Sequence, residues 1–178
     1  SHAEELYSSM SSQKPTEEEK QKFMGRAIEL SDEGPSKGHG GPFAAVIVKD
    51  GKIIGEGYNR EVVDYDPTAH GEMTAIRQAC KNIRSTDLSG CEIYTSCEPC
   101  AMCSSAIWLC RFDRVYYGNR LEDTKSDMDL EPLFQFVAAP IDQRSTPAEQ
   151  VRSKEAYDVI KKWANDPNGF IICCDQKK

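Results

Sequence analysis

Residues 42–60, PFAAVIVKDGKIIGEGYNR, restrict the folds open to this sequence more than any other segment. Two runs of apolar and largely β-branched residues flank Asp50-Gly51. This dipeptide suits the two positive φ angles of a type I′ turn. The pattern predicts a β-hairpin closed by a tight two-residue turn.

Helical patterns lie on both sides of this hairpin. From Thr16 to about Gly34, apolar residues recur among charged ones as in an amphipathic helix: Phe23, Ala27, Ile28 and Leu30. A second helix follows Asp66-Pro67, with Thr68 as its expected N-cap. One of its faces carries apolar residues spaced by three and four: Met73, Ile76, Cys80 and Ile83.

Two more strand patterns follow, CEIYTS at residues 91–96 and DRVYYGN at residues 113–119. Between them we expect a third helix, opened by Pro99 and running from Cys100 to about Cys110. Strands joined by helices of this length favour parallel pairing. The sequence therefore predicts an α/β fold with three layers, α/β/α, around a central mixed sheet.

The remaining segments give weaker patterns. Residues 1–16 are polar and rich in serine, and we expect a flexible N-terminal arm. Residues 121–145 are expected to be irregular, with one helical turn near residues 132–137, and a last helix to run from about residue 147 to 163. We expect residues 17–178 to form a single domain.

Composition excludes several classes of protein. The net charge of the 178-residue chain is −7, which disfavours non-specific binding to nucleic acid. No window approaches the ~20 apolar residues of a membrane span, and no signal sequence is recognised. Eight cysteines are present, but a domain of this size needs no disulfides, so we expect reduced thiols and a cytoplasmic protein. Four of these cysteines lie in or beside apolar runs and are expected to be buried thiols: Cys80, Cys91, Cys97 and Cys110.

Two short motifs, PTAHGE and SCEPCAMC, carry residues typical of a metal site. His70 is expected in the first turn of the second helix, and Cys100 and Cys103 in the first turn of the third. The partial positive charge of a helix N-terminus favours thiolates. Two thiolates and one imidazole are the ligand set of a zinc site that keeps one tetrahedral position for water or substrate. The pattern predicts one catalytic Zn²⁺ per chain.

Glu72 lies two residues from His70, about 200° around an ideal helix. It is therefore expected beside the metal and not as a ligand to it. There it can act as a general base and acid, taking a proton from the attacking water and giving it to a leaving nitrogen. A redox Cys-x-x-Cys pair and half of a structural zinc finger are alternatives for the cysteines alone. The joint pattern with His70 and Glu72 favours the catalytic site.

His-x-Glu followed by Pro-Cys-x-x-Cys is the pattern of the zinc nucleobase deaminases. GGPFAAVIVKDGKIIGEGYNR, DPTAHGEMTAIRQAC and YTSCEPCAMCSSAIW together resemble the cytidine deaminase superfamily, in the branch that contains the bacterial-type guanine deaminases. The resemblance covers nearly the whole chain. It implies a cytidine deaminase-like fold and hydrolysis of guanine to xanthine and ammonia.

The resemblance also implies residues that bind the substrate. Asn59 matches the asparagine that binds the base, and Phe43 is a candidate to stack on it. Trp108 either closes the site or packs against the sheet. The relatives use an acid after the fourth strand, for which EDTKSDMDLE offers Asp129 first and Asp127 second.

Other functions remain open at this level. Gly71, where that branch usually has alanine, is shared with fungal cytosine deaminases, so cytosine or cytidine is an alternative substrate. A tRNA adenosine deaminase would carry a basic groove, which this acidic chain does not predict. A zinc-binding interaction protein would not need Glu72. The family forms dimers, some by exchange of the C-terminal segment, so we expect a homodimer in which residues beyond about 147 contact the partner.

Overall fold

The structure of the protein, a computed structural model, describes residues 14–172. Most of the expected N-terminal arm therefore lies outside the described residues, as do Cys173 and Cys174. The chain divides into two compact units, one up to Asp129 and one from Leu130 onward. The single domain expected from residue 17 to 178 stays a prediction.

The first unit contains a four-stranded sheet. Its strands are β1 (Ala44–Lys49), β2 (Lys52–Tyr58), β3 (Cys91–Cys97) and β4 (Arg114–Asn119), in the spatial order β2-β1-β3-β4. β1 pairs antiparallel with both β2 and β3, whereas β3 and β4 are parallel. The sheet is mixed, as the sequence predicts.

The hairpin turn between β1 and β2 has the expected geometry. Asp50 has a φ of 50° and Gly51 a φ of 75°, so both central residues adopt the positive φ angles of a type I′ turn. The register shifts by one residue between Ile47 and Val48, which marks a β-bulge.

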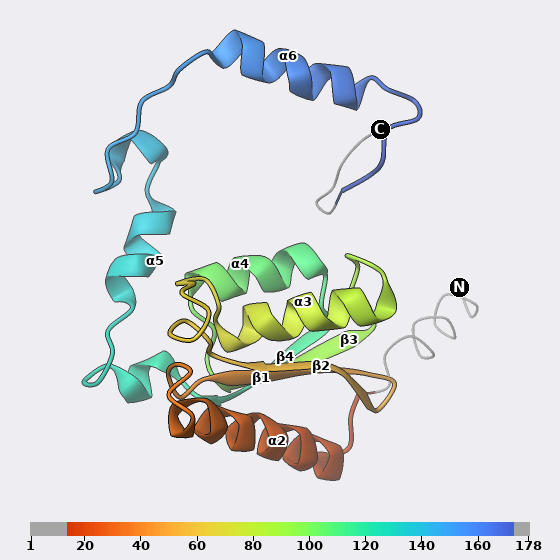
Figure 1. Cartoon of the computed structure of the whole chain (residues 1–178), viewed down its shortest axis with the longest axis vertical. Helices are drawn as coiled ribbons and strands as arrows, with labels where there is room; N and C mark the ends of the chain where they lie inside the picture. The colour runs from red at the N-terminus through yellow and green to blue at the C-terminus, as the bar shows by residue number, and fades with distance from the viewer. Residues whose placement is uncertain (1–13, 173–178) are drawn as a thin grey trace, which may run out of the picture. The chain divides into compact units, whose positions relative to one another are not determined.

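Helices cover both faces of this sheet (Figure 1). α2 (Glu17–Ser36) lies on one face, and α3 (Gly71–Ile83) and α4 (Ala101–Cys110) lie on the other. Alternate residues of β1 enter two separate cores, because side chains along a strand point to opposite faces. Val46 packs with α2, whereas Ile47 packs with α3 and α4. The three-layer α/β/α arrangement is confirmed.

α2 begins where the sequence predicts. Thr16 and Glu19 form a reciprocal capping box, with distances of 3.1 Å in both directions. The buried face of the helix consists of Phe23, Ala27, Leu30 and Gly34. Ile28 was expected on this face, but its side chain is 54% exposed because it lies off the buried stripe.

The segment after β4 is more helical than expected. A 3-10 turn, η1 (Leu121–Thr124), ends the first unit's regular structure, and α5 (Glu131–Ala138) has two turns instead of one. The second unit also contains η2 (Ile141–Gln143) and α6 (Ser153–Ala164). The expected start of the last helix at residue 147 was wrong, because Arg152 adopts a left-handed φ of 54° that a helix cannot include.

The second unit has no buried residue between 130 and 172, the part of it that the structure describes. Its exposed apolar side chains include Ile141, Val151, Val159 and Ile160. No helix within residues 14–172 is long and apolar enough to cross a membrane.

Candidate metal centre

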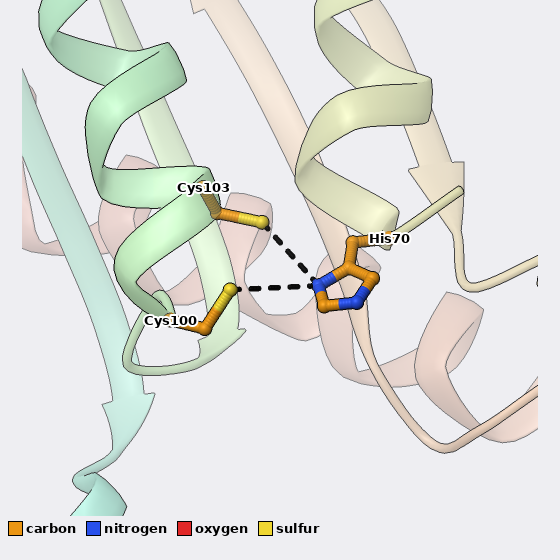
Figure 2. Close-up of side chains that lie close together, drawn as sticks. All are labelled: His70, Cys100 and Cys103. Carbon is orange, nitrogen blue, oxygen red and sulfur yellow. Dashed lines mark hydrogen bonds between the residues drawn. The ribbon is translucent and has the colours of Figure 1, made fainter. Parts of the chain in front are cut away.

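Three side chains from two helix N-termini meet on the α3 and α4 side of the sheet (Figure 2). The Nδ1 atom of His70 lies 3.6 Å from Sγ of Cys100 and 3.5 Å from Sγ of Cys103. All three ligand atoms lie within 4.8 Å of one another. The structure therefore brings together the three residues that the sequence predicts as metal ligands.

The local start of each helix differs slightly from the prediction. His70 is the N-cap of α3 and Cys100 the N-cap of α4, both with extended backbone. Thr68 does not cap α3, because its amide and hydroxyl both donate to Oδ1 of Asp66, at 2.8 and 2.7 Å. Pro99 likewise precedes the N-cap of α4 instead of opening the helix.

The donor spacing fits a zinc ion. Zn–N bonds of about 2.0–2.1 Å and a Zn–S bond of about 2.3 Å at a tetrahedral angle place nitrogen and sulfur about 3.6 Å apart. The two distances from His70 to the thiols agree with this value. Two sulfurs and one imidazole nitrogen are also ligands that zinc prefers.

The two thiols share one negative charge. A hydrogen bond from Cys103, helped by His70, lowers the pKa of Cys100 to about 4. The same bond to Cys100, together with burial, raises the pKa of Cys103. In turn the hydrogen bond with Cys100 raises the pKa of His70. The site thus favours a thiolate at Cys100, and a negatively charged sulfur attracts a cation.

Glu72 lies in the first turn of α3 and is only 6% exposed. Burial raises the pKa of this carboxyl, and a hydrogen bond with Cys103 partly offsets that effect. A carboxyl with a raised pKa next to the thiols is suited to exchange protons. Its neighbour Gly71 packs closely on β1, since a Cβ atom there would lie 2.7 Å from Cα of Ala44.

Asn59 and Phe43 lie next to each other at the ends of β2 and β1. Asn59 is buried, and its backbone N–H donates to the carbonyl oxygen of Phe43 at 2.8 Å. Oδ1 of Asn59 accepts hydrogen bonds from the amides of Gly41 and Glu61, at 3.2 and 3.1 Å. The side-chain oxygen of Asn59 is therefore occupied by backbone amides of the protein, and the side-chain nitrogen Nδ2 is the atom that can donate to a ligand. Phe43 is half-buried.

Trp108 and Asp129, two of the predicted substrate-binding residues, are both exposed. Trp108 lies near the end of α4 with 64% of its side chain exposed, so it does not pack against the sheet as one alternative required. Asp129 is exposed at the end of the first unit, as is Asp127.

Sequence analysis missed Glu61. Its Oε1 atom lies 2.9 Å from Nε2 of His70, on the side of the ring opposite to the thiols. Glu61 belongs to no recognised motif, and nine positions separate it from His70. Only the loop that folds back after β2 brings the two together.

Comparisons with known proteins agree with this geometry. A family model described as the cytidine and deoxycytidylate deaminase zinc-binding region matches residues 17–119. The guanine deaminase of Bacillus subtilis (strain 168) is 43% identical over 147 residues, which are 82% of this chain and 94% of that protein. An X-ray structure of guanine deaminase from Bacillus subtilis matches with a TM-score of 0.81 and 41% identity, over 85% of this chain and 98% of that one. The tRNA-specific adenosine deaminase of Aquifex aeolicus (strain VF5) is 46% identical, over 43% of this chain and 51% of that protein.

Proposed function

Because the chain belongs to the cytidine and deoxycytidylate deaminase family, we propose that it is a zinc-dependent hydrolase that converts guanine to xanthine and ammonia. One observation carries the choice of guanine: the likeness to a guanine deaminase extends over 94% of that relative. The likeness to the tRNA adenosine deaminase covers less than half of this chain. The net charge of −7 also disfavours a polynucleotide substrate.

His70, Cys100 and Cys103 are the proposed zinc ligands. A zinc ion held by these three residues would lower the pKa of the attacking water. Cys100, the N-cap of α4, and Cys103, in its first turn, would hold the ion where the helix N-terminus stabilises thiolates.

Glu72 is the proposed proton carrier. In guanine hydrolysis, a water oxygen adds to C2 while Glu72 takes a proton from that water and passes it to ring N3. Glu72 then takes the remaining proton from the oxygen on C2 and delivers it to the exocyclic amine, the C2–N bond breaks, and ammonia leaves. The oxygen stays on C2 as the new carbonyl of xanthine. Burial of Glu72 keeps bulk water from competing for these protons.

Asn59, Phe43, Trp108 and Asp129 are the proposed substrate-binding residues. Since Oδ1 of Asn59 accepts hydrogen bonds from two backbone amides, Asn59 would bind the base by donating a hydrogen bond from Nδ2. Phe43, beside it, supplies a flat apolar surface for the ring. An acid, Asp129 first and Asp127 second, would accept the N1–H of a lactam base, which adenine lacks. If the bound base encloses this acid, adenine would leave it buried and unpaired at a cost of ~1–3 kcal/mol, enough for about tenfold to hundredfold discrimination.

We further propose a cytoplasmic homodimer. The described cysteines form no disulfides, which fits a reducing compartment: Cys80, Cys91, Cys97, Cys100, Cys103 and Cys110. The second unit exposes apolar side chains along α6 and has no core of its own in the described residues. A second copy of the chain would bury this surface, with residues beyond about 147 against the partner.

A substrate panel tests the proposed activity. Ammonia release and ultraviolet absorbance are followed with guanine, adenine, cytosine and their nucleosides side by side, using the zinc-loaded protein. We expect guanine to be turned over faster than all the others, and at least tenfold faster than adenine, as the unpaired-partner cost predicts. Faster turnover of cytosine or of a nucleoside would overturn the choice of guanine. Release of no ammonia from any of them would overturn the proposed deaminase reaction on small bases.

A further inference from the structure

The tripeptide Asn59–Glu61 joins the proposed base-binding residue to the metal centre. The amide of Glu61 donates to Oδ1 of Asn59 at 3.1 Å. The amide of Arg60 donates to the carbonyl oxygen of Ala69 at 2.9 Å, and Ala69 directly precedes His70. The loop that carries Glu61 is therefore bonded to the segment that carries the histidine ligand.

The His70 ring has a different partner on each nitrogen. Nδ1 faces the thiols of Cys100 and Cys103, and Nε2 lies 2.9 Å from Oε1 of Glu61. A carboxylate accepts and cannot donate, so this contact places the ring proton on Nε2. The lone pair of Nδ1 then points to the position between the thiols.

We propose that Glu61 is a positioning residue for the metal centre: it fixes the tautomer and the orientation of the His70 ring. The inference rests on the zinc site of the proposed function. His70 needs such a partner because it stands at the N-cap of α3, half-buried and without a side-chain cap bond. Metal-binding histidines commonly donate their second N–H to a carboxylate, and loss of that carboxylate weakens metal affinity about 10- to 100-fold.

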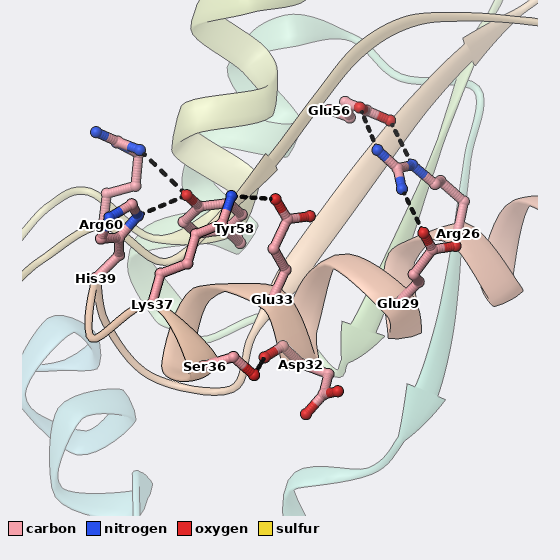
Figure 3. Close-up of polar contacts among 10 residues, drawn as sticks. All are labelled: Arg26, Glu29, Asp32, Glu33, Ser36, Lys37, His39, Glu56, Tyr58 and Arg60. Atoms are coloured by element: carbon pink, nitrogen blue, oxygen red, sulfur yellow. Dashed lines mark hydrogen bonds and ion pairs between the residues drawn. The ribbon is translucent and has the colours of Figure 1, made fainter.

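The loop around Glu61 is held in place from several sides. The amides of Val62 and Val63 both donate to the carbonyl oxygen of His39, at 3.1 Å. The Arg60 guanidinium donates to both carboxylate oxygens of Asp64, at 2.9 and 3.0 Å. It also donates to the Tyr58 hydroxyl, which lies 2.6 Å from Nδ1 of His39 (Figure 3).

These bonds fix the backbone of Glu61 independently of its side chain. The contact between Glu61 and His70 is itself partly exposed, with side-chain exposures of 39% and 29%. Partly exposed pairs of this kind contribute little to the stability of a fold. The function of Glu61 therefore lies in the orientation of the ring, and its side chain can be changed without loss of the loop.

The experiment measures how fast zinc leaves the protein. Zinc-loaded wild type, Glu61→Gln, Glu61→Ala and Asp64→Ala proteins are mixed with a chelator, and the transfer of zinc is followed by absorbance. We expect Glu61→Ala to lose zinc about 10- to 100-fold faster than wild type. Glu61→Gln keeps an oxygen that accepts the Nε2 proton and should stay within about threefold of wild type. Asp64→Ala removes another carboxylate of the same loop and should match wild type, because the amides of Val62 and Val63 still hold the loop through the carbonyl oxygen of His39.

A second readout follows the tautomer directly. Nitrogen-15 NMR of the zinc-loaded protein should show a slowly exchanging Nε2 proton on His70 in wild type and Glu61→Gln, but a fast-exchanging one in Glu61→Ala. KM for guanine should be unchanged in Glu61→Ala, because the amide of residue 61 still holds Asn59.

Three outcomes would overturn the inference while the proposed function stands. They are a Glu61→Ala protein that keeps zinc as well as wild type, a Glu61→Gln protein as impaired as Glu61→Ala, and an Asp64→Ala protein that loses zinc equally fast. A Cys103→Ser protein, which lacks a proposed ligand, gives the rate of zinc loss expected for a site with one ligand removed. A wild-type protein that binds no zinc would overturn the proposed metal site itself.

Discussion

In the proposed site, the residue assigned to proton transfer, Glu72, lies within a single turn of α3 from the proposed ligand His70. It directly follows Gly71, which packs on β1, and lies two residues after His70, yet it approaches the centre through Cys103 and not through His70. The metal ligands are thus complete without it. This arrangement allows the carboxyl to be removed while the donor set of two sulfurs and one nitrogen remains.

Replacement of Glu72 by Gln is expected to abolish most of the activity and to leave zinc content unchanged. General acid–base groups contribute ~10²–10⁴-fold, and Glu72 acts in two proton transfers, so the loss in kcat should reach at least the upper part of that range. Zinc is measured by elemental analysis and kcat by ammonia release. Glu92→Gln, which changes another partly buried carboxyl far from the ligands, is the matched control and should keep wild-type activity. Loss of zinc from Glu72→Gln, or near wild-type turnover by it, would contradict the assigned role.

At the scale of elements, the distance between α3 and the sheet depends on small residues. β2 presents Gly55 and Gly57 to α3, and a Cβ atom at Gly57 would lie 2.7 Å from Cβ of Thr74 and 2.8 Å from the amide nitrogen of Ala75. Real Cβ atoms do not approach other atoms so closely. The first turn of α3, with Glu72, is therefore held where it is by a close helix–strand contact some residues away.

Gly57→Ala should accordingly destabilise the protein by ~1–3 kcal/mol, the usual cost of an added methyl group in a packed interior. Gly25→Ala is the matched control. Gly25 lies on the exposed side of α2 with nothing within 4 Å of a Cβ atom, so alanine there should stabilise the fold by ~0.5–1 kcal/mol through helix propensity. Urea unfolding of the two variants measures both effects. A Gly57→Ala protein as stable as wild type would show that α3 can move away from the sheet freely.

Elements with a strong local pattern could be predicted from the sequence. The turn at Asp50-Gly51 and the helices α2, α3 and α4 agree with the prediction to within a few residues, since periodicity and turn chemistry are local. The prediction that Thr68 caps α3 was wrong because the Thr68 hydroxyl bonds to the Asp66 carboxylate and not to the helix N-terminus. The start of α6 was wrong because the left-handed backbone at Arg152 has no sequence signal.

The candidate site shows the same division between local and distant contacts. His70, Glu72, Cys100 and Cys103 lie in two short motifs, and each motif places its residues in one helix turn. The contact between Glu61 and His70 depends on how a loop folds back, and the exposure of Trp108 depends on what surrounds α4. Neither follows from spacing along the chain.

At the scale of the whole molecule, the second unit exposes many apolar side chains in its described residues. Along α6, four apolar residues recur at spacings of three and four and form one stripe: Ala156, Val159, Ile160 and Trp163. Val159 and Ile160 are 68% and 55% exposed. An apolar stripe of this kind on a helix without a core of its own is typical of an interaction surface.

A homodimer that buries this stripe should be broken by a charge placed on it. In Val159→Glu, a carboxylate would have to enter an apolar interface without a partner, which costs on the order of several kcal/mol, so the variant should sediment as a monomer at micromolar concentration. Lys154 lies on the opposite side of α6 and is 88% exposed, so Lys154→Gln should remain a dimer like wild type. Sedimentation velocity of the three proteins, with circular dichroism to confirm that Val159→Glu is folded, measures the difference. A wild-type monomer would contradict the proposed assembly, and a dimeric Val159→Glu protein would place the interface away from this stripe.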